Sequence, residues 1–145
     1  MTDIFAAIFE LLSLYSKDLG EHLRGFNLRC KAYDAGAFYN TIGLVSILSP
    51  LFFSLMYYLV IDRPKLSKII TWFLFGLVSG LIPFIWAYVK VSNDVANKMY
   101  CKELQITSGD TWGWALTVLL WTLVFYFIYS LVIKNFSTNC KRIPF

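Results

Sequence analysis

Hydrophobic residues in this chain gather into long uncharged runs, which short charged segments separate from one another. Three such runs cover residues 36–61, 69–89 and 111–133. Each run is long enough to be a transmembrane helix, because about 20 helical residues cross the hydrocarbon core of a bilayer. The pattern therefore predicts an all-α integral membrane protein with three transmembrane helices, and the length of the chain predicts a single membrane domain over residues 1–145.

The first stretch of the chain follows a different pattern. Between residues 3 and 24, apolar side chains recur every three or four positions, while polar and charged ones, among them Glu10, Lys17 and Arg24, take the opposite face. This period predicts an N-terminal amphipathic helix over residues 3–24. Its charges exclude a further span, so we expect the helix to lie in the membrane interface or to pack against the spans.

Charged residues between the runs bear on how the chain crosses the membrane. With three spans, the N-terminal region and the polar loop over residues 90–110 share one side, and the 62–68 turn and the C-terminal tail share the other. Lys and Arg residues near the span ends are equally numerous on the two sides, so the positive-inside rule gives no decision. The acidic residues lie mainly on the N-terminal side, which favours an inner or plasma membrane protein with its N-terminus outside and its C-terminus in the cytoplasm.

The composition fits a membrane protein and argues against several other classes. Of 145 residues, 58% are hydrophobic and only 15% are charged, against about a quarter in a soluble domain. The basic residues that give a net charge of +4 flank the runs, as membrane topology requires, so we expect no nucleic acid partner. The runs contain no ionisable Asp, Glu, Lys, Arg or His side chain, and no cofactor-binding, metal-binding or catalytic motif is present. The sequence thus predicts no enzyme, no cofactor and no metal site.

Two of the runs contain a related segment. Residues 43–53 and 76–86 are identical at six of eleven positions, and both place a serine four residues before a proline: Ser46 and Pro50, Ser79 and Pro83. Proline cannot donate to the carbonyl four residues earlier, so each segment leaves a serine carbonyl for a hydroxyl or a water to satisfy. The two spans run in opposite directions, and paired broken helices in such an inverted repeat are typical of an ion or substrate site. The alternative is that residues common in membrane helices match by chance.

Small residues in the first two runs mark faces that can pack closely. Gly76 and Gly80 stand four positions apart, which lets another helix approach, either from the same chain or from another copy. One helical stripe of the first run, Gly43, Ser46, Pro50 and Ser54 with Ser49 at its edge, suits a narrow pore wall or a tight interface. The third run is dominated by large side chains, and we expect it to face lipid. The candidates for lining a pore or packing helices are Ser46, Ser49, Pro50, Ser54, Gly76, Ser79, Gly80 and Pro83.

The cysteines and the histidine add two further expectations. Cys30 and Cys101 fall on the same side of the membrane, whereas Cys140 falls on the other. A Cys30–Cys101 disulfide can form only if that side is oxidising, and the alternative is that all three are free thiols. His22, the only histidine, stands on the amphipathic helix and is interpreted as an interfacial side chain, with a pH-sensitive role as the alternative.

Two functions are compatible with these features. The one that the sequence favours is a small homo-oligomeric channel or membrane-permeabilising effector, with a narrow and weakly selective pore lined by the serines. The alternative is a non-conducting accessory or scaffold subunit of a larger membrane complex. A third function, an enzyme acting on lipids through Cys101, Asp94 or His22, lacks any pattern that would align those side chains. The expected partners are membrane lipid, further copies of the chain and a second membrane protein.

Overall fold

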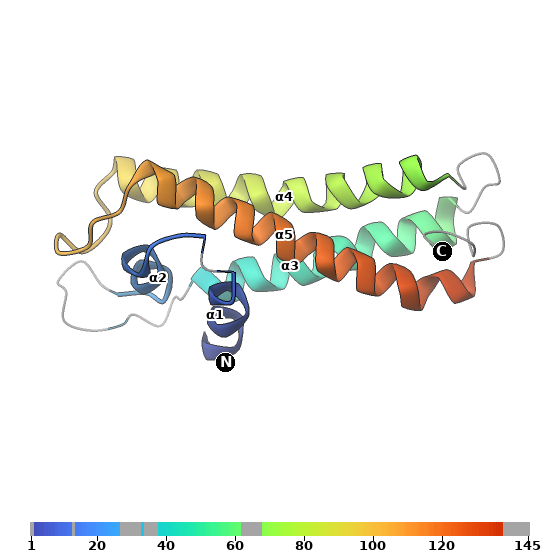
Figure 1. Ribbon diagram of the computed structural model, residues 1–145, viewed down its shortest axis with the longest axis horizontal. Helices are drawn as coiled ribbons and strands as arrows, with labels where there is room; N and C mark the ends of the chain where they lie inside the picture. Colours follow the sequence, from blue (N-terminus) through green and yellow to red (C-terminus); the bar gives the residue numbers. More distant parts are fainter. Residues whose placement is uncertain (1, 13, 27–32, 34–37, 62–67, 138–145) are drawn as a thin grey trace.

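The structure of the chain is a computed structural model, which describes residues 2–12, 14–26, 33, 38–61 and 68–137. Its helices are α1 (Thr2–Glu10), α2 (Lys17–Leu23), α3 (Phe38–Leu55), α4 (Ile69–Ala96) and α5 (Ser108–Ile133). A π-helical segment, η1 (Met56–Ile61), continues α3, and a 3-10 turn, η3 (Lys134–Phe136), follows α5. In Figure 1, α3, α4 and α5 run alongside one another as a long bundle, and α1 and α2 lie together at one end of it. We call the described residues between 2 and 25, which hold α1 and α2, the headpiece.

The helices of the bundle are long and apolar enough to cross a membrane. They are Phe38–Ile61, Ile69–Ala96 and Ser108–Phe136, with 24, 28 and 29 residues. The predicted all-α membrane fold with three spans is thereby confirmed. The second helix is longer than its predicted range, because α4 continues into the polar segment as far as Ala96. An ion pair between residues four apart, from the Lys90 ammonium to the Asp94 carboxylate at 2.8 Å, supports this extra helical part.

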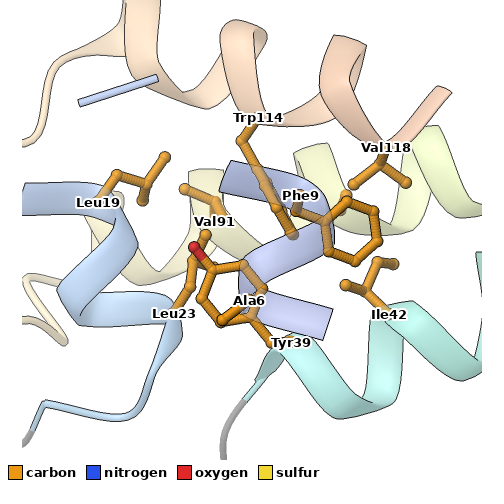
Figure 2. Close-up of a cluster of buried hydrophobic side chains, with 10 residues drawn as sticks. Ala6, Phe9, Leu19, Leu23, Tyr39, Ile42, Val91, Trp114 and Val118 are labelled. Atoms are coloured by element: carbon orange, nitrogen blue, oxygen red, sulfur yellow. The ribbon is translucent and has the colours of Figure 1, made fainter. Parts of the chain in front are cut away.

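The N-terminal segment forms two short helices, which differs from the single amphipathic helix predicted over residues 3–24. Helix α1 ends at Glu10, and Ser16 begins α2 by accepting the backbone N–H of Leu19 on its side-chain oxygen at 3.3 Å, as a helix N-cap does. The break turns the chain so that Phe9 of α1 and Leu19 of α2 enter the same core (Figure 2), while Leu11 between them stays 75% exposed. Helical spacing alone could not reveal the break, since Leu11 continues the apolar period.

The main hydrophobic core lies where the headpiece meets the bundle. Figure 2 shows side chains from α1, α2, α3, α4 and α5 converging there, with the indole of Trp114 among them. The rings of Phe9, Tyr15 and Tyr39 meet Trp114 edge to face, with centroids 5.1, 5.3 and 5.4 Å away. Each such aromatic pair adds about 0.5–1.5 kcal/mol beyond the area that it buries. The headpiece is therefore held by an aromatic cluster as well as by its apolar stripe.

Helix α5 lies against both α3 and α4, which corrects the expectation that the third run faces lipid. Large residues suggested a lipid-facing helix, yet Trp114 and Tyr126 are themselves buried. The hydroxyls on the inner face are satisfied within the helix, because Thr117 donates to the Gly113 carbonyl at 2.9 Å and Thr122 donates one turn back at 2.7 Å. A helix of high mean hydropathy can thus bury one face, with its aromatic and hydroxyl side chains, against other helices of the same chain.

Candidate functional site

The residues singled out in the first span form one buried face of α3. Gly43, Ser46, Pro50 and Ser54 are all buried, and the two serines are 0% exposed. The predicted stripe is a single helical face, and it is turned toward the other helices of the same chain. Ser79 in the second span is 0% exposed as well. Among the described residues, the hydroxyls of Ser46 and Ser54 have no hydrogen-bond partner. The free-energy cost of burying each hydroxyl is therefore not offset by a hydrogen bond to these residues.

A hydroxyl from α3 repairs the break that Pro83 makes in α4. Pro83 has no N–H to give to the carbonyl of Ser79. The side chain of Ser49 donates to that carbonyl instead, at 2.8 Å. The hydroxyl of Ser79 donates within its own helix, to the carbonyl of Gly76 at 2.7 Å. The Ser49 contact therefore ties α3 to α4 and supports the continuation of α4 through Pro83.

Gly76 and Gly80 pack α4 against α5 within one chain. A Cβ atom at Gly76 would lie 2.8 Å from Cδ1 of Tyr126, and one at Gly80 would lie 2.7 Å from Cδ1 of Leu119. Cβ atoms essentially never approach other heavy atoms this closely, so the two helices use the space that the missing side chains leave. Contact within one chain is thus one use of this glycine pair, and contact with another copy stays a prediction.

The chain segment that precedes α2 packs against the start of α5. Asp110 accepts the backbone N–H of Ser16 at 2.8 Å, and it also accepts the backbone N–H and the hydroxyl of Thr107 in a capping box. One carboxylate thus caps α5 and holds the N-cap residue of α2. The backbone of Leu14 lies so close to Gly113 that a Cβ at residue 113 would be 2.8 Å from the Leu14 carbonyl carbon and closer still to its oxygen.

A second polar contact joins α2 to the outer end of α4. The Nε2 atom of His22 lies 3.3 Å from one carboxylate oxygen of Asp94, whose other oxygen accepts from the Lys90 ammonium at 2.8 Å. The side chains of His22 and Asp94 are only 11% and 12% exposed, so the pair is largely removed from solvent. His22 is therefore part of the contact between headpiece and bundle. Because His22 and Asp94 stand 72 residues apart, no sequence period could have paired them.

The hypothesis of an enzyme acting on lipids named Cys101, Asp94 and His22. His22 and Asp94 do meet, but Cys101 is buried and disulfide-bonded, so it has no free thiol to act as a nucleophile. Its predicted partner, Cys30, lies outside the described residues, as does Cys140. In the described part of the chain, no group of three His, Cys, Asp or Glu side chains could hold a metal ion.

A pocket of about 380 Å³ opens between α1 and α2 in the headpiece. One nitrogen of the Arg24 guanidinium, Nη2, donates to both carboxylate oxygens of Glu10, at 2.7 and 2.8 Å. The hydroxyl of Tyr15 shares a 2.9 Å hydrogen bond with that of Tyr39 at the start of α3. The hydrogen bond with Glu10 raises the pKa of Arg24 above its ordinary value, and burial raises the pKa of Tyr15 to about 12, so the guanidinium stays charged and the phenol neutral. The lining consists of Glu10, Tyr15, Ser16, Lys17, Gly20, Glu21 and Arg24.

Comparison of the chain with protein-family models, curated proteins and solved structures finds no match. A function is therefore argued from the arrangement of its own residues. Sequence reasoning marked the serines and glycines of the spans, and the structure brings Ser49 together with Ser79 and the glycine pair against α5. It missed the headpiece pocket, because the lining comes from two helices whose relative position depends on the turn between Glu10 and Ser16.

Proposed function

We propose that this chain is a non-conducting accessory or scaffold subunit of a larger membrane complex. One observation carries the proposal: along residues 42–61, 69–89 and 112–132, every exposed side chain is apolar. The small residues of the spans are used between helices of one chain instead, as Ser49, Gly76 and Gly80 illustrate. The outer surface of the bundle is thus suited to lipid or to the apolar face of another membrane helix.

A homo-oligomeric channel, the function that the sequence favoured, would need a polar lumen between copies. Copies that met through their present outer surfaces would enclose a lumen lined by side chains such as Leu48, Phe52 and Leu81, which would exclude water. Conduction past the serines would require the contact between Ser49 and Ser79 to open. The channel stays a prediction, and the experiment below distinguishes it from the scaffold.

The polar surface for a protein partner lies at the headpiece end of the bundle. The segment between α4 and α5 is polar at most of its exposed positions. Two of these residues, Lys102 and Glu103, directly follow the buried Cys101, whose disulfide anchors the segment. We expect the partner to contact this segment. The exposed polar residues of the segment are Asn97, Lys98, Lys102, Glu103, Gln105 and Thr107.

We infer that this end faces an oxidising compartment outside the cytoplasm, because Cys101 is disulfide-bonded. We propose Cys30 as its partner, because within one chain Cys140 cannot reach Cys101. Cys140 follows Ser137 by three residues, which span at most about 11 Å. Ser137 lies beyond the far end of α5, whose 26 residues extend about 39 Å. Peptide mapping without reduction should recover the Cys30 and Cys101 peptides joined to each other, and a Cys101–Cys140 bond would contradict this inference.

The test of the scaffold proposal is the composition of the protein extracted from its native membrane in mild detergent. We expect one other membrane protein in fixed stoichiometry, measured by quantitative mass spectrometry. The charge exchange K102E with E103K should lower recovery of that partner about tenfold, which corresponds to about 1.4 kcal/mol. It should not change thermal stability, since both side chains are exposed. The matched control is K68E, a charge change at the opposite end of the bundle, which should leave recovery unchanged.

The second measurement is conductance. The reconstituted wild-type protein should give no ion flux above that of empty liposomes. A closed homo-oligomer that conducts would overturn the scaffold proposal and support the channel. A chain that extracts alone, with neither partner nor flux, would also contradict the proposal.

A further inference from the structure

The headpiece pocket lies beside the first turn of the first span. Tyr15 in its lining is hydrogen-bonded to Tyr39 in the first turn of α3. Phe5 of α1 fills the space beside Gly43, one turn further into the span. Figure 1 shows α1 and α2 at the end of the bundle where α3 and α5 begin. The pocket is thus placed where the spans leave the hydrocarbon core and enter the headgroup region.

The lining of the pocket carries charges of both signs. Glu10 and Glu21 supply carboxylates, and Lys17 and Arg24 supply cations, so these side chains together have no net charge. A site for a simple anion would be cationic, and a site for a simple amine would be acidic. Equal numbers of the two signs suit a ligand that itself carries an ammonium and a phosphate.

Donors and acceptors remain available for such a ligand. Arg24 uses Nη2 for the two oxygens of Glu10, and its Nη1 lies 3.8 Å from Glu21 Oε1, which among the described residues leaves the N–H of Nε. Lys17 is exposed, and among the described residues no carboxylate lies within ion-pair distance of its ammonium. Glu21 accepts from the Tyr33 hydroxyl on Oε2, while its Oε1 is 3.8 Å from Arg24 Nη1 and can accept from an ammonium.

Exposed apolar side chains stand in the segment that joins two lining residues of the pocket, Glu10 and Tyr15. Leu11, Leu12 and Leu14 stand between Glu10 and Tyr15 in the chain, and they are 75%, 40% and 49% exposed. Exposed leucines in this number are unfavourable in water and favourable against lipid. Exposed leucines next to the charged pocket in the chain suit a ligand whose charged headgroup continues into an apolar part.

We propose that the headpiece pocket binds the zwitterionic headgroup of a phospholipid, with its phosphate at Lys17 and Arg24 and its ammonium at Glu21. The volume of about 380 Å³ falls in the range of small-molecule sites, roughly 300–1,000 Å³. Gly20 in the lining leaves space for a ligand, because it has no side chain. A Cβ there would occupy part of the pocket, 3.5 Å from the Tyr39 hydroxyl oxygen and 3.8 Å from Glu10 Oε1. This binding does not depend on the scaffold role proposed above.

The test uses the full chain in detergent and measures binding by isothermal titration calorimetry. The probes are short-chain phosphatidylethanolamine, short-chain phosphatidylglycerol and water-soluble glycerophosphoethanolamine. We expect the phosphatidylethanolamine to bind about tenfold or more tightly than either of the others. Equal affinity for the two lipids would overturn the zwitterionic assignment. Equal affinity for phosphatidylethanolamine and its water-soluble analogue would overturn the assignment to a lipid and indicate a soluble ligand.

Variants of the lining test the location of the site. Gly20→Leu fills the pocket, and Lys17→Glu removes a cation from an exposed position that takes part in no ion pair among the described residues. Each should weaken phosphatidylethanolamine binding by about tenfold or more. The matched control is Gly109→Leu in the first turn of α5, where a Cβ would meet only the Thr107 hydroxyl oxygen at 3.6 Å. Unchanged affinity in the Lys17 variant, which is expected to fold normally, would overturn the proposal.

Discussion

Replacing Gly113 with alanine should displace the headpiece from the bundle. A Cβ at this position would lie 2.8 Å from the carbonyl carbon of Leu14 and closer still to its oxygen. The obstacle is backbone and not the flexible end of a side chain, so the segment around Leu14 must move. A movement of about 1 Å would lengthen the hydrogen bond from Ser16 to Asp110, which is 2.8 Å long, beyond the range in which it holds.

Opposing contributions set the size of the effect. A lost hydrogen bond to a charged group costs about 1.5–3 kcal/mol. Forcing an extra carbon atom into a packed contact costs about 1–3 kcal/mol. Alanine in place of glycine inside a helix returns about 1 kcal/mol. We therefore expect Gly113→Ala to lower the free energy of unfolding by about 1.5–5 kcal/mol.

Gly109 provides a matched control one turn earlier on the same helix. The Cβ of Gly109→Ala would meet only the Thr107 hydroxyl oxygen at 3.6 Å, which is an ordinary contact. The assay is thermal unfolding in detergent followed by tryptophan fluorescence, combined with limited proteolysis of the segment between α1 and α2. Gly113→Ala should lower the midpoint and speed the cleavage, and Gly109→Ala should do neither. Equal stability of the two variants would refute the close contact between Leu14 and α5.

The remaining predictions concern a span and the headpiece. Ser49→Ala should cost about 1–3 kcal/mol in thermal unfolding, because it leaves the Ser79 carbonyl unsatisfied beside Pro83. Ser54→Ala on the same helix should be neutral, since among the described residues the Ser54 hydroxyl has no partner, and equal losses in both variants would contradict this. Burial raises the pKa of Tyr15 to about 12, above its ordinary value near 10, so the stability from its neutral form is complete below about pH 10 and lost as the pH rises through about 12. An alkaline titration of tyrosine absorbance should show an ionisation near pH 12 in the wild type, and Tyr15→Phe should lower the amplitude of that step by the contribution of one tyrosine.

The spans could be predicted from the sequence because lipid leaves the backbone few choices. A long run without charges must satisfy its own hydrogen bonds, so it forms a helix. The positions of the helices around one another could not be predicted in the same way, since hydropathy does not say which face of α5 is buried. The break before α2 is also a tertiary effect, because the Asp110 that holds Ser16 stands 94 residues away. The headpiece pocket depends on that break, so it could not be predicted from the sequence either.

The related segments of α3 and α4 present the same kinds of residue to the interior. The glycine, the serine and the proline of each segment are buried. Each glycine also admits an aromatic ring, which comes from Phe5 of α1 at Gly43 and from Tyr126 of α5 at Gly76. The shared pattern therefore has a packing role in both places, although the partners come from different helices.

The hydrogen bond between the two segments argues against an ion or substrate site at their interface. Ser49 donates to the Ser79 carbonyl, but the residue aligned with Ser49 in the second segment is Ile82, which is exposed and has no hydroxyl. A site at the centre of an inverted repeat draws ligands from matching positions of both halves. Here one half supplies a hydroxyl and the other supplies only the carbonyl that Pro83 left unpaired. The pairing of Ser49 with the carbonyl that Pro83 leaves free is thus better explained as a packing contact that joins α3 to α4, and this agrees with the proposed non-conducting subunit.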